Sequence, residues 1–201
     1  MSSDSISKLI IKPVSLCFLF VLAAIPLHAQ TSVLIVYHSE TGNTEKLAKA
    51  VAEGASHVYG VDVVLKPSNQ TDEQHLLNAD AIIVGSPVYN ANVSPEISRF
   101  IASWPFEGEP LKDKIGAAFV TAGGISAGEE LVQMNILQSM LMFGMIVAGG
   151  PEWTQAFGAS AIVGEPPFES ETPGEIDEAF LNKGRALGKR VAEIAMQMKK
   201  D

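Results

Sequence analysis

The sequence predicts an α/β fold in which helices cover both faces of a parallel sheet. Apolar runs of strand length alternate with amphipathic helical patterns along most of the chain, as a parallel sheet with crossover helices requires. The run at 79–85, ADAIIVG, is typical of a strand that is buried on both faces. Another run, at 33–37, passes through a glycine-containing turn directly into a helical pattern. Together these features indicate one α/β domain.

The first half of the chain begins with the strand at 33–37. A helix is predicted over 44–58, where apolar residues recur at helical spacing and form one stripe. A short strand at 61–65 is closed by Pro67, which lacks the N–H that a sheet requires. Residues 68–78 are polar, and we expect a loop there with a single turn of helix.

A new helix is predicted to begin after the buried strand. Ser94 is a favoured N-cap residue, and Pro95 suits the first helical position because its missing N–H would have no partner there. The remaining elements are a strand at 114–120, a helix at 129–143, a strand that starts at 145–147, an irregular Gly- and Pro-rich segment at 149–174 and an amphipathic helix at 175–199.

The turn after the first strand has the composition of a phosphate-binding loop. It reads HSETGNT and offers the hydroxyls of Ser39, Thr41 and Thr44 around Gly42, at the start of a helix. Helix N-termini bind phosphate through backbone N–H groups and the helix dipole. Because the turn contains no Lys or Arg, we expect it to hold a mononucleotide cofactor and not a nucleotide that is hydrolysed. The alternative is an ordinary helix N-terminus, capped by Thr41 or Asn43.

Spacing excludes two common phosphate-binding motifs. A nucleoside-triphosphatase loop requires a second glycine and a Lys followed by Ser or Thr, whereas this loop has only Gly42. The dinucleotide-binding fingerprint requires several glycines at fixed offsets, and these are also missing from the loop.

Two further loops leave the same edge of the predicted sheet. Ligands of open α/β sheets bind beyond the carboxyl ends of the strands. The segments at that edge are the first loop (39–44), the second loop (86–93, SPVYNANV) and the third loop (121–128, TAGGISAG). Glycines in the third loop allow its backbone to approach a ligand closely. The three loops together are a more specific signal than any one of them.

The first loop resembles the FMN phosphate loop of flavodoxin-like proteins, which have a hydroxyl-x-x-Gly-x-Thr pattern after a strand, and the similarity covers 31–199. Within that superfamily the chain is most similar to the tryptophan-repressor-binding-protein branch of NAD(P)H:quinone oxidoreductases. This similarity rests on four segments: GSPVYNANVSPEISRFI at 85–101, KIGAAFVTAGGISAGEE at 114–130, FGM at 143–145 and FGASAIVG at 157–164. The resemblance implies a flavodoxin-like three-layer sandwich with a five-stranded parallel sheet of order 2-1-3-4-5.

The resemblance also implies a role for each loop. The flavin phosphate is expected to bind the first loop, at Ser39, Glu40, Thr41, Gly42, Asn43 and Thr44. The ring is expected to contact the second loop, at Pro87, Val88, Tyr89, Asn90 and Asn92, where Asn92 reaches either the ring or the loop backbone. Backbone N–H groups of the third loop are expected to reach the flavin carbonyls and N5, from Thr121, Ala122, Gly123, Gly124 and Ile125. Tyr89 is the candidate catalytic residue, as a hydrogen-bonding or stacking group near the acceptor.

The chain departs from this branch in the expected ring pocket. Tyr89 and Asn90 stand where the family has Arg followed by an aromatic residue, and Met142 and Phe143 stand where it has His residues. The insertion that follows the second strand in the family is also shortened. The fold and FMN therefore carry over more directly than the reductase activity.

The function that the resemblance implies is an FMN-dependent NAD(P)H:quinone reductase. In such enzymes flavin N5 accepts a hydride from NAD(P)H, and electrons then pass to a quinone or a similar small acceptor. The alternative is a flavodoxin-type carrier that moves single electrons between redox protein partners. A third reading is a flavin-binding protein that has no redox partner or a decayed site. Assembly as a homodimer or a homotetramer is compatible with the resemblance.

Residues 1–29 are predicted to be a signal peptide. Lys8 and Lys12 precede an apolar stretch at 14–25, which is shorter than the ~20 residues that span a bilayer. The sequence Leu-His-Ala that ends at Ala29 resembles a cleavage site. Cleavage there gives an exported protein, periplasmic or secreted, and the alternative is an uncleaved membrane anchor. The only cysteine of the chain lies in this segment, so the mature chain has no disulfide.

The mature chain is strongly acidic. The whole chain has 14 basic and 23 acidic residues, of which two and one lie in residues 1–29, so the mature chain has 12 and 22 and a net charge of −10. This charge argues against nucleic acid and anionic membranes as partners and favours neutral or basic ones.

The histidines have no metal-ligand spacing, so we expect no metal site. His38 follows the first strand and is a candidate for a phosphate contact, whereas His57 and His75 are expected at the surface. Trp104 and Trp153 are expected either to line the flavin cleft or to pack in the core or an interface.

Overall fold

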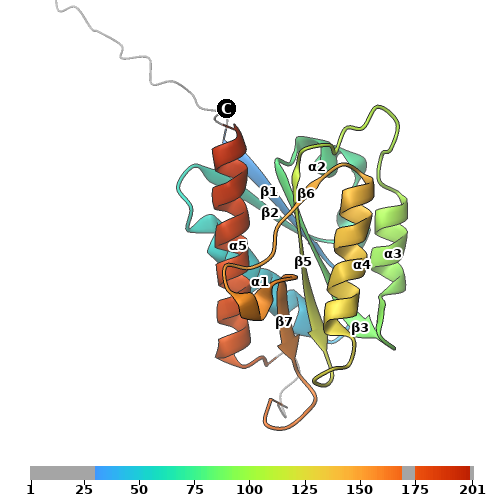
Figure 1. Ribbon diagram of the computed structural model, residues 1–201, viewed down its shortest axis with the longest axis vertical. Coiled ribbons are helices and arrows are strands. Elements are labelled where there is room, and N and C mark those ends of the chain that lie inside the picture. The colour runs from blue at the N-terminus through green and yellow to red at the C-terminus, as the bar shows by residue number, and fades with distance from the viewer. Residues whose placement is uncertain (1–29, 169–174, 200–201) are drawn as a thin grey trace, which may run out of the picture.

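The computed structural model describes residues 30–168 and 175–199, which form a three-layer α/β sandwich (Figure 1). The predicted signal peptide lies outside the described residues. Within the two described ranges, no helix has both the length and the apolar character needed to cross a membrane.

The parallel strands occur in the predicted order. The sheet follows the path β2-β1-β3-β5-β6, which corresponds to 2-1-3-4-5 when the five predicted strands are numbered along the chain. Its members are β1 (Thr31–Tyr37), β2 (Val61–Pro67), β3 (Ala81–Tyr89), β5 (Ile115–Ala122) and β6 (Ile146–Val147). Two short strands join this path: β4 (Asn92–Val93) pairs antiparallel with β3, and β7 (Ala159–Ile162) pairs parallel with β5.

Within the part of the chain that the structure describes, the sheet therefore has seven strands instead of the predicted five. The fifth strand position is divided, because β6 pairs with residues 115–116 of β5 and β7 pairs with residues 119–122. The prediction of an irregular segment over 149–174 is wrong at β7. That strand has only four residues and lies between Gly158 and Gly164, so it is too short for a clear hydrophobic period.

Helices cover both faces of the sheet (Figure 1). On one face lie α1 (Asn43–Ser56) and α5 (Glu178–Lys199), and on the other lie α2 (Glu73–Asn78), α3 (Pro95–Ala102) and α4 (Glu129–Met142). Two 3₁₀ turns, η1 (Ser68–Gln70) and η2 (Trp153–Gln155), belong to connections. The predicted start of α3 is confirmed, since the Ser94 hydroxyl accepts the N–H of Ile97 at 3.3 Å and Pro95 is the first helical residue.

The central strand β1 is buried on both sides, as its β-branched sequence predicts. Val33 and Ile35 pack against the side covered by α1 and α5, and Leu34 and Val36 pack against the opposite side. This alternation follows from the two-residue period of a strand. It divides the hydrophobic core into two clusters, one on each face of the sheet.

Helices α1 and α5 cross in close contact at glycine residues. A Cβ atom at Gly188 of α5 would lie 1.9 Å from the backbone oxygen of Val51 in α1, and a Cβ at Gly54 would lie 1.9 Å from that of Arg185. The backbones therefore touch without side chains between them. Because α1 follows the first loop directly, this contact fixes the position of that loop over the sheet.

We predict that Gly188→Ala lowers the free energy of unfolding by about 1–3 kcal/mol, because the added methyl group must push the two backbones apart. An Ala in place of a Gly inside a helix would otherwise be stabilising by about 1 kcal/mol. Gly184→Ala is the matched control, since its Cβ would meet a flexible methyl group of Leu47 at 2.9 Å and should cost less. Urea unfolding measures both variants, and a Gly188→Ala protein as stable as the wild type would contradict the backbone contact.

Candidate functional site

The three predicted loops converge at the carboxyl edge of the sheet. Pro87, near the end of β3, is the register neighbour of Thr121, near the end of β5. The hydroxyls of Thr44, in the first turn of α1, and Thr121 form a buried hydrogen bond of 2.7 Å. The first and third loops are thus joined directly, across β3. A ligand that meets the first loop can reach the other two.

The first loop presents the N-terminus of α1 without a side-chain cap. Gly42 occupies the N-cap position with φ 88°. Because glycine has no side chain, the first turn of the helix receives no capping hydrogen bond from this position. The Ser39 hydroxyl accepts the N–H of Gly42 at 3.1 Å and closes the turn. Thr41 and Asn43 contact each other, with Asn43 Nδ2 donating to Thr41 Oγ1 at 3.3 Å. The alternative of a helix capped by Thr41 or Asn43 is therefore wrong, and the first-turn N–H groups suit an external anion.

Thr44 has a different role from the other two hydroxyls of the loop. Its residue is only 2% exposed, and its hydroxyl is engaged with Thr121. A hydroxyl has one donor and two acceptor sites, so a second contact stays available to it. The role that the structure shows is to hold the loop in place, whereas Ser39 and Thr41 lie nearer the surface.

The second loop is a β-hairpin, which the sequence analysis did not predict. Strand β3 continues to Tyr89 and pairs with β4, so that Val88 faces Val93. Asn90 and Ala91 form the turn with φ of 50° and 59°. Both values are those of a type I′ turn, which is easy to recognise from Asn-Gly but not from Asn-Ala. Of the two contacts expected for Asn92, the structure shows the one to the loop, since its Nδ2 donates to the Asn90 carbonyl at 2.7 Å.

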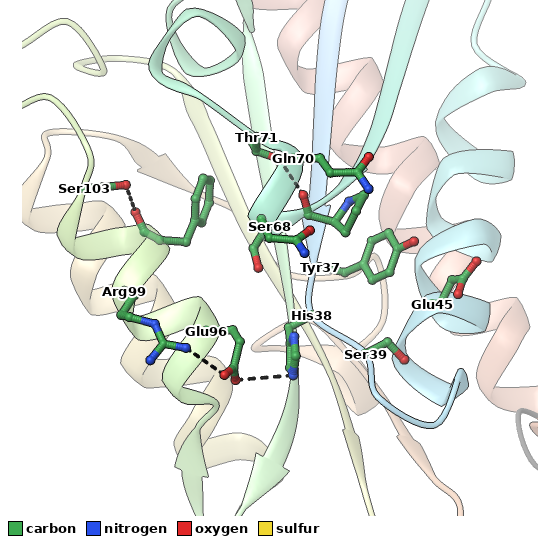
Figure 2. A pocket seen from close by; sticks show the side chains of 13 residues that line it. Tyr37, His38, Ser39, Glu45, Ser68, Gln70, Thr71, Glu96, Arg99 and Ser103 are labelled. Carbon is green, nitrogen blue, oxygen red and sulfur yellow. Dashed lines mark hydrogen bonds and ion pairs between the residues drawn. The ribbon is translucent and has the colours of Figure 1, made fainter.

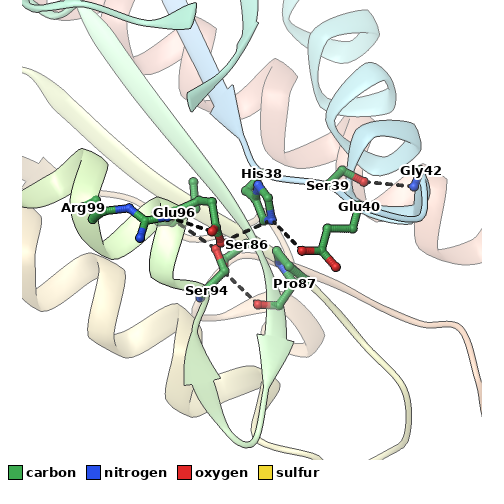
Figure 3. Close-up of polar contacts among 10 residues, drawn as sticks. His38, Ser39, Glu40, Gly42, Ser86, Pro87, Ser94, Glu96 and Arg99 are labelled. Carbon is green, nitrogen blue, oxygen red and sulfur yellow. Dashed lines mark hydrogen bonds and ion pairs between the residues drawn. The ribbon is translucent and has the colours of Figure 1, made fainter. Parts of the chain in front are cut away.

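Charged side chains connect the first loop to α3 (Figure 3), and Glu40 also interacts with Tyr89 of the hairpin. Burial, the negative charge of Glu40 and a hydrogen bond to Glu40 together raise the pKa of Tyr89. The Nε2 atom of His38 lies 3.3 Å from Oε2 of Glu96 and 3.9 Å from Oε1 of Glu40, without hydrogen-bond geometry. Arg99 donates to Glu96 at 2.8 Å. The His38 side chain therefore faces acidic groups, and not the α1 N-terminus that was expected to hold a phosphate.

The third loop has an open backbone surface. Gly123 is exposed, and a Cβ atom there would meet nothing within 4 Å. The N–H of Ile125 donates to Oε2 of Glu165 at 2.6 Å, so one of the N–H groups predicted to reach the flavin has an acceptor within the chain. Sequence reasoning missed Glu165, because it follows β7, which was itself missed. A reading of ASAI between two glycines as a short strand would have placed it at this edge.

Other candidate residues lie away from the loops. Trp104 is 5% exposed and packs edge-on against Phe143, with ring centroids 5.2 Å apart, so it belongs to the core. Met142 is the last residue of α4 and Phe143 is its C-cap, whereas the third loop precedes the N-terminus of that helix. Trp153 is 89% exposed on η2. His57 is exposed as predicted, and the side chain of His75 is 28% exposed in the capping box of α2.

No group of three or more His, Cys, Asp or Glu residues with the arrangement of a metal site occurs among residues 30–168 and 175–199. The chemistry offered by the three loops is instead that of a phosphate and a planar ring. The α1 N-terminus and two hydroxyls suit the phosphate, and Tyr89 and the open glycine backbone suit the ring.

Comparisons with known proteins agree with this arrangement. Residues 65–159 match the family model of NADPH-dependent FMN reductases. The chain is 37% identical over 170 residues to a flavodoxin from Aquifex aeolicus, covering 80% of this chain and 86% of that one. It is 32% identical over 199 residues to an NAD(P)H dehydrogenase (quinone) from Azorhizobium caulinodans, covering 83% of this chain and 98% of that one. A crystal structure of a flavodoxin, WrbA-like protein from Agrobacterium tumefaciens shares the fold, with a TM-score of 0.67 and 24% identity. The match covers 83% of this chain and 98% of that one.

We predict that Thr44→Val and Thr121→Val each lower the free energy of unfolding by about 1–3 kcal/mol, since each leaves a buried hydroxyl without its partner. The double variant should lose less than the sum of the two, because it removes both members of the hydrogen bond. Urea unfolding of the four proteins gives the coupling energy. Strictly additive losses would contradict a direct link between the first and third loops.

The pKa of Glu96 predicts a pH-dependent contribution to stability. A hydrogen bond from its own backbone N–H, and then the charges of His38 and Arg99, hold the pKa of this carboxyl below its ordinary value. A carboxyl with a lowered pKa in the folded state stabilises the fold above its unfolded pKa, and the contribution is lost as pH falls through the folded pKa.

We therefore expect Glu96→Gln to be less stable than the wild type at neutral pH, with a difference that shrinks as the solution is acidified through the carboxyl range. Unfolding curves at a series of pH values measure this, with Glu107→Gln in an exposed segment as the control. A difference that stays constant from neutral to acid pH would mean that the Glu96 charge does not contribute.

Proposed function

Because the chain belongs to the flavodoxin-like superfamily of FMN proteins, we propose that it is an FMN-dependent oxidoreductase of the NAD(P)H:quinone reductase type. The observation that carries the proposal is the uncapped N-terminus of α1, held by the Thr44–Thr121 hydrogen bond next to an open glycine loop. This is a phosphate site made without a cation, beside a surface for a ring. Relatives of the quinone dehydrogenase class at 30% and 32% identity support the reductase assignment.

The residues of the three loops fit FMN. The first-turn N–H groups of α1, with Ser39 and Thr41, would hold the phosphate, and the helix dipole would favour its negative charge. Tyr89 would flank the ring from the hairpin, and Gly123, beside which the space is open, would let the backbone approach it. Bound there, FMN supplies hydride acceptance at N5 and electron delivery to an acceptor.

The side chains around the first loop direct negative charge away from the phosphate site and hold Tyr89 in place beside the ring. The Glu40 side chain turns toward Tyr89 and His38, so its charge points away from the N–H groups that suit the phosphate. The Tyr89 hydroxyl, held by Glu40, keeps its proton over a wide pH range because its pKa is raised. Because its one proton is donated to Glu40, Tyr89 offers a bound ring or acceptor its aromatic face and a hydroxyl oxygen that can accept a hydrogen bond.

A flavodoxin-type electron carrier is the second candidate. The 37% identity to a flavodoxin and the net charge of −10 expected for the mature chain favour it, since an acidic carrier suits basic protein partners. Assembly as a homodimer or homotetramer stays a prediction under either function.

Anaerobic stopped-flow mixing separates the two candidates. We expect NADH or NADPH to bleach the visible absorbance of the FMN-loaded protein rapidly, and a quinone to restore it. Loss of absorbance with dithionite, combined with no response to either nicotinamide, would contradict the reductase and favour the carrier. The measurement uses the flavin as its own indicator, so binding and reduction are followed in one experiment.

We also propose that the protein is exported, periplasmic or secreted, after cleavage at Ala29. The charged start and short apolar stretch of residues 1–29 support this, and strand β1 begins only two residues later. Mass spectrometry of the protein from fractionated cells should find an N-terminus at Gln30 outside the cytoplasm. An intact N-terminus in the membrane fraction would instead identify an uncleaved anchor.

A further inference from the structure

A cavity of about 570 Å³ lies beside the first loop, on its β2 side (Figure 2). Pro67 at the end of β2 and residues 68–71 after it form one wall, and α3 with its C-cap, from Glu96 to Ser103, forms another. Thr121 belongs to β5, on the other side of β3. The cavity is therefore separate from the space that the three loops enclose, but it shares His38 and Ser39 with the first loop. Its volume is in the range of small-molecule sites, about 300–1,000 Å³.

The walls of the cavity combine flat and polar groups. Tyr37 supplies a partly exposed ring face against which a planar ligand can lie, and Pro67 and the buried Phe100 add apolar lining. Asn69 and Gln70 on η1 are exposed amides that line the same space. An amide side chain can donate to and accept from one edge of an adenine at the same time, through the N6 and N7 positions. The 3₁₀ turn thus presents two groups suited to a purine base.

Two carboxylates on opposite sides of the cavity suit sugar hydroxyls. Figure 2 shows Glu45 on the α1 side and Glu96 on the α3 side, with His38 between them. Carboxylates next to nucleotide sites accept hydrogen bonds from ribose hydroxyls. Each one is paired with a base, Glu45 with Lys49 at 2.6 Å and Glu96 with Arg99 at 2.8 Å. These pairs offset part of the acidic charge that would oppose a ligand carrying phosphate.

A short row of side chains lies between the cavity and the ring side of the proposed FMN site. Glu96 and His38 line the cavity. His38 lies 3.9 Å from Glu40, which is hydrogen-bonded to Tyr89 on the hairpin. A molecule that reaches from Tyr89 across Glu40 and His38 would enter the cavity at its α3 wall. A dinucleotide has this two-ended form, with a reactive ring and an adenosine joined by a pyrophosphate.

We propose that this cavity binds the adenosine end of the reduced nicotinamide dinucleotide whose other end reaches the hairpin at Tyr89. The proposal rests on the reductase function proposed above. Asn69 and Gln70 contact the base, Tyr37 and Phe100 provide its apolar surroundings, and Glu96 receives a ribose hydroxyl.

Calorimetric titration with ADP-ribose, which lacks the nicotinamide, tests the cavity by itself. The FMN-loaded protein is titrated as the wild type, as the double variant Asn69→Ala/Gln70→Ala and as Gln138→Ala, an exposed amide on α4 that serves as the matched control. We expect wild type and control to bind alike and the double variant to bind about tenfold more weakly, as the loss of two or more hydrogen bonds predicts. The same variant should raise the KM for NADH or NADPH and leave the saturating rate of flavin reduction unchanged.

Two patterns of results separate this inference from the proposed function. Rapid bleaching by a nicotinamide, with no ADP-ribose binding or with equal binding by all three proteins, overturns the cavity assignment and leaves the reductase intact. ADP-ribose binding that the double variant weakens, with no bleaching, supports the nucleoside site and overturns the reductase. Circular dichroism and melting curves of the double variant show whether a loss of binding comes from a loss of folding.

Discussion

The parallel pairing of β3 with both β1 and β5 is the constraint on which the site depends. Because the three strands run in one direction, the loops that follow them leave the same edge of the sheet. The hydrogen bond between Thr44 and Thr121 then joins the outer two loops over the end of β3. The close crossing of α1 and α5 at glycine residues holds the helix that follows the first loop. Strand direction thus places the three loops at one edge of the sheet. The Thr44–Thr121 hydrogen bond and the crossing of α1 and α5 then hold the first loop close to the third.

A phosphate site without Lys or Arg must use the backbone, and the local structure is consistent with that requirement. Gly42 adopts a left-handed conformation and leaves the α1 N-terminus without a side-chain cap. Acidic side chains lie nearby, but Glu40 is engaged by Tyr89, and Glu96 by Arg99 and His38. Glu40 and Tyr89 belong to different elements, as do Glu96 and His38, whereas Glu96 and Arg99 both lie on α3. The carboxylates of Glu40 and Glu96 therefore face the hairpin and α3, and not the N-terminus of α1.

The fold and the three loops could be predicted because their signals are local. Hydrophobic period located β1, β3 and the helices, and the Ser94-Pro95 pair located the start of α3. The parts that were missed depend on contacts between distant residues. Strand β7 exists through its pairing with β5, and Glu165 reaches Ile125 from 40 residues further along the chain. The structural role of Thr44 also needed its partner, because the sequence alone shows three similar hydroxyls in one loop.

The most direct test of this account is a comparison of FMN with riboflavin, which has the same ring and lacks the phosphate. Titration of the cofactor-free protein, followed by quenching of flavin fluorescence, should give one FMN per chain and an affinity for riboflavin that is lower by more than about tenfold, because charge-assisted hydrogen bonds to the phosphate are lost. Equal affinity for both, or no binding of FMN, would contradict a phosphate site at the N-terminus of α1.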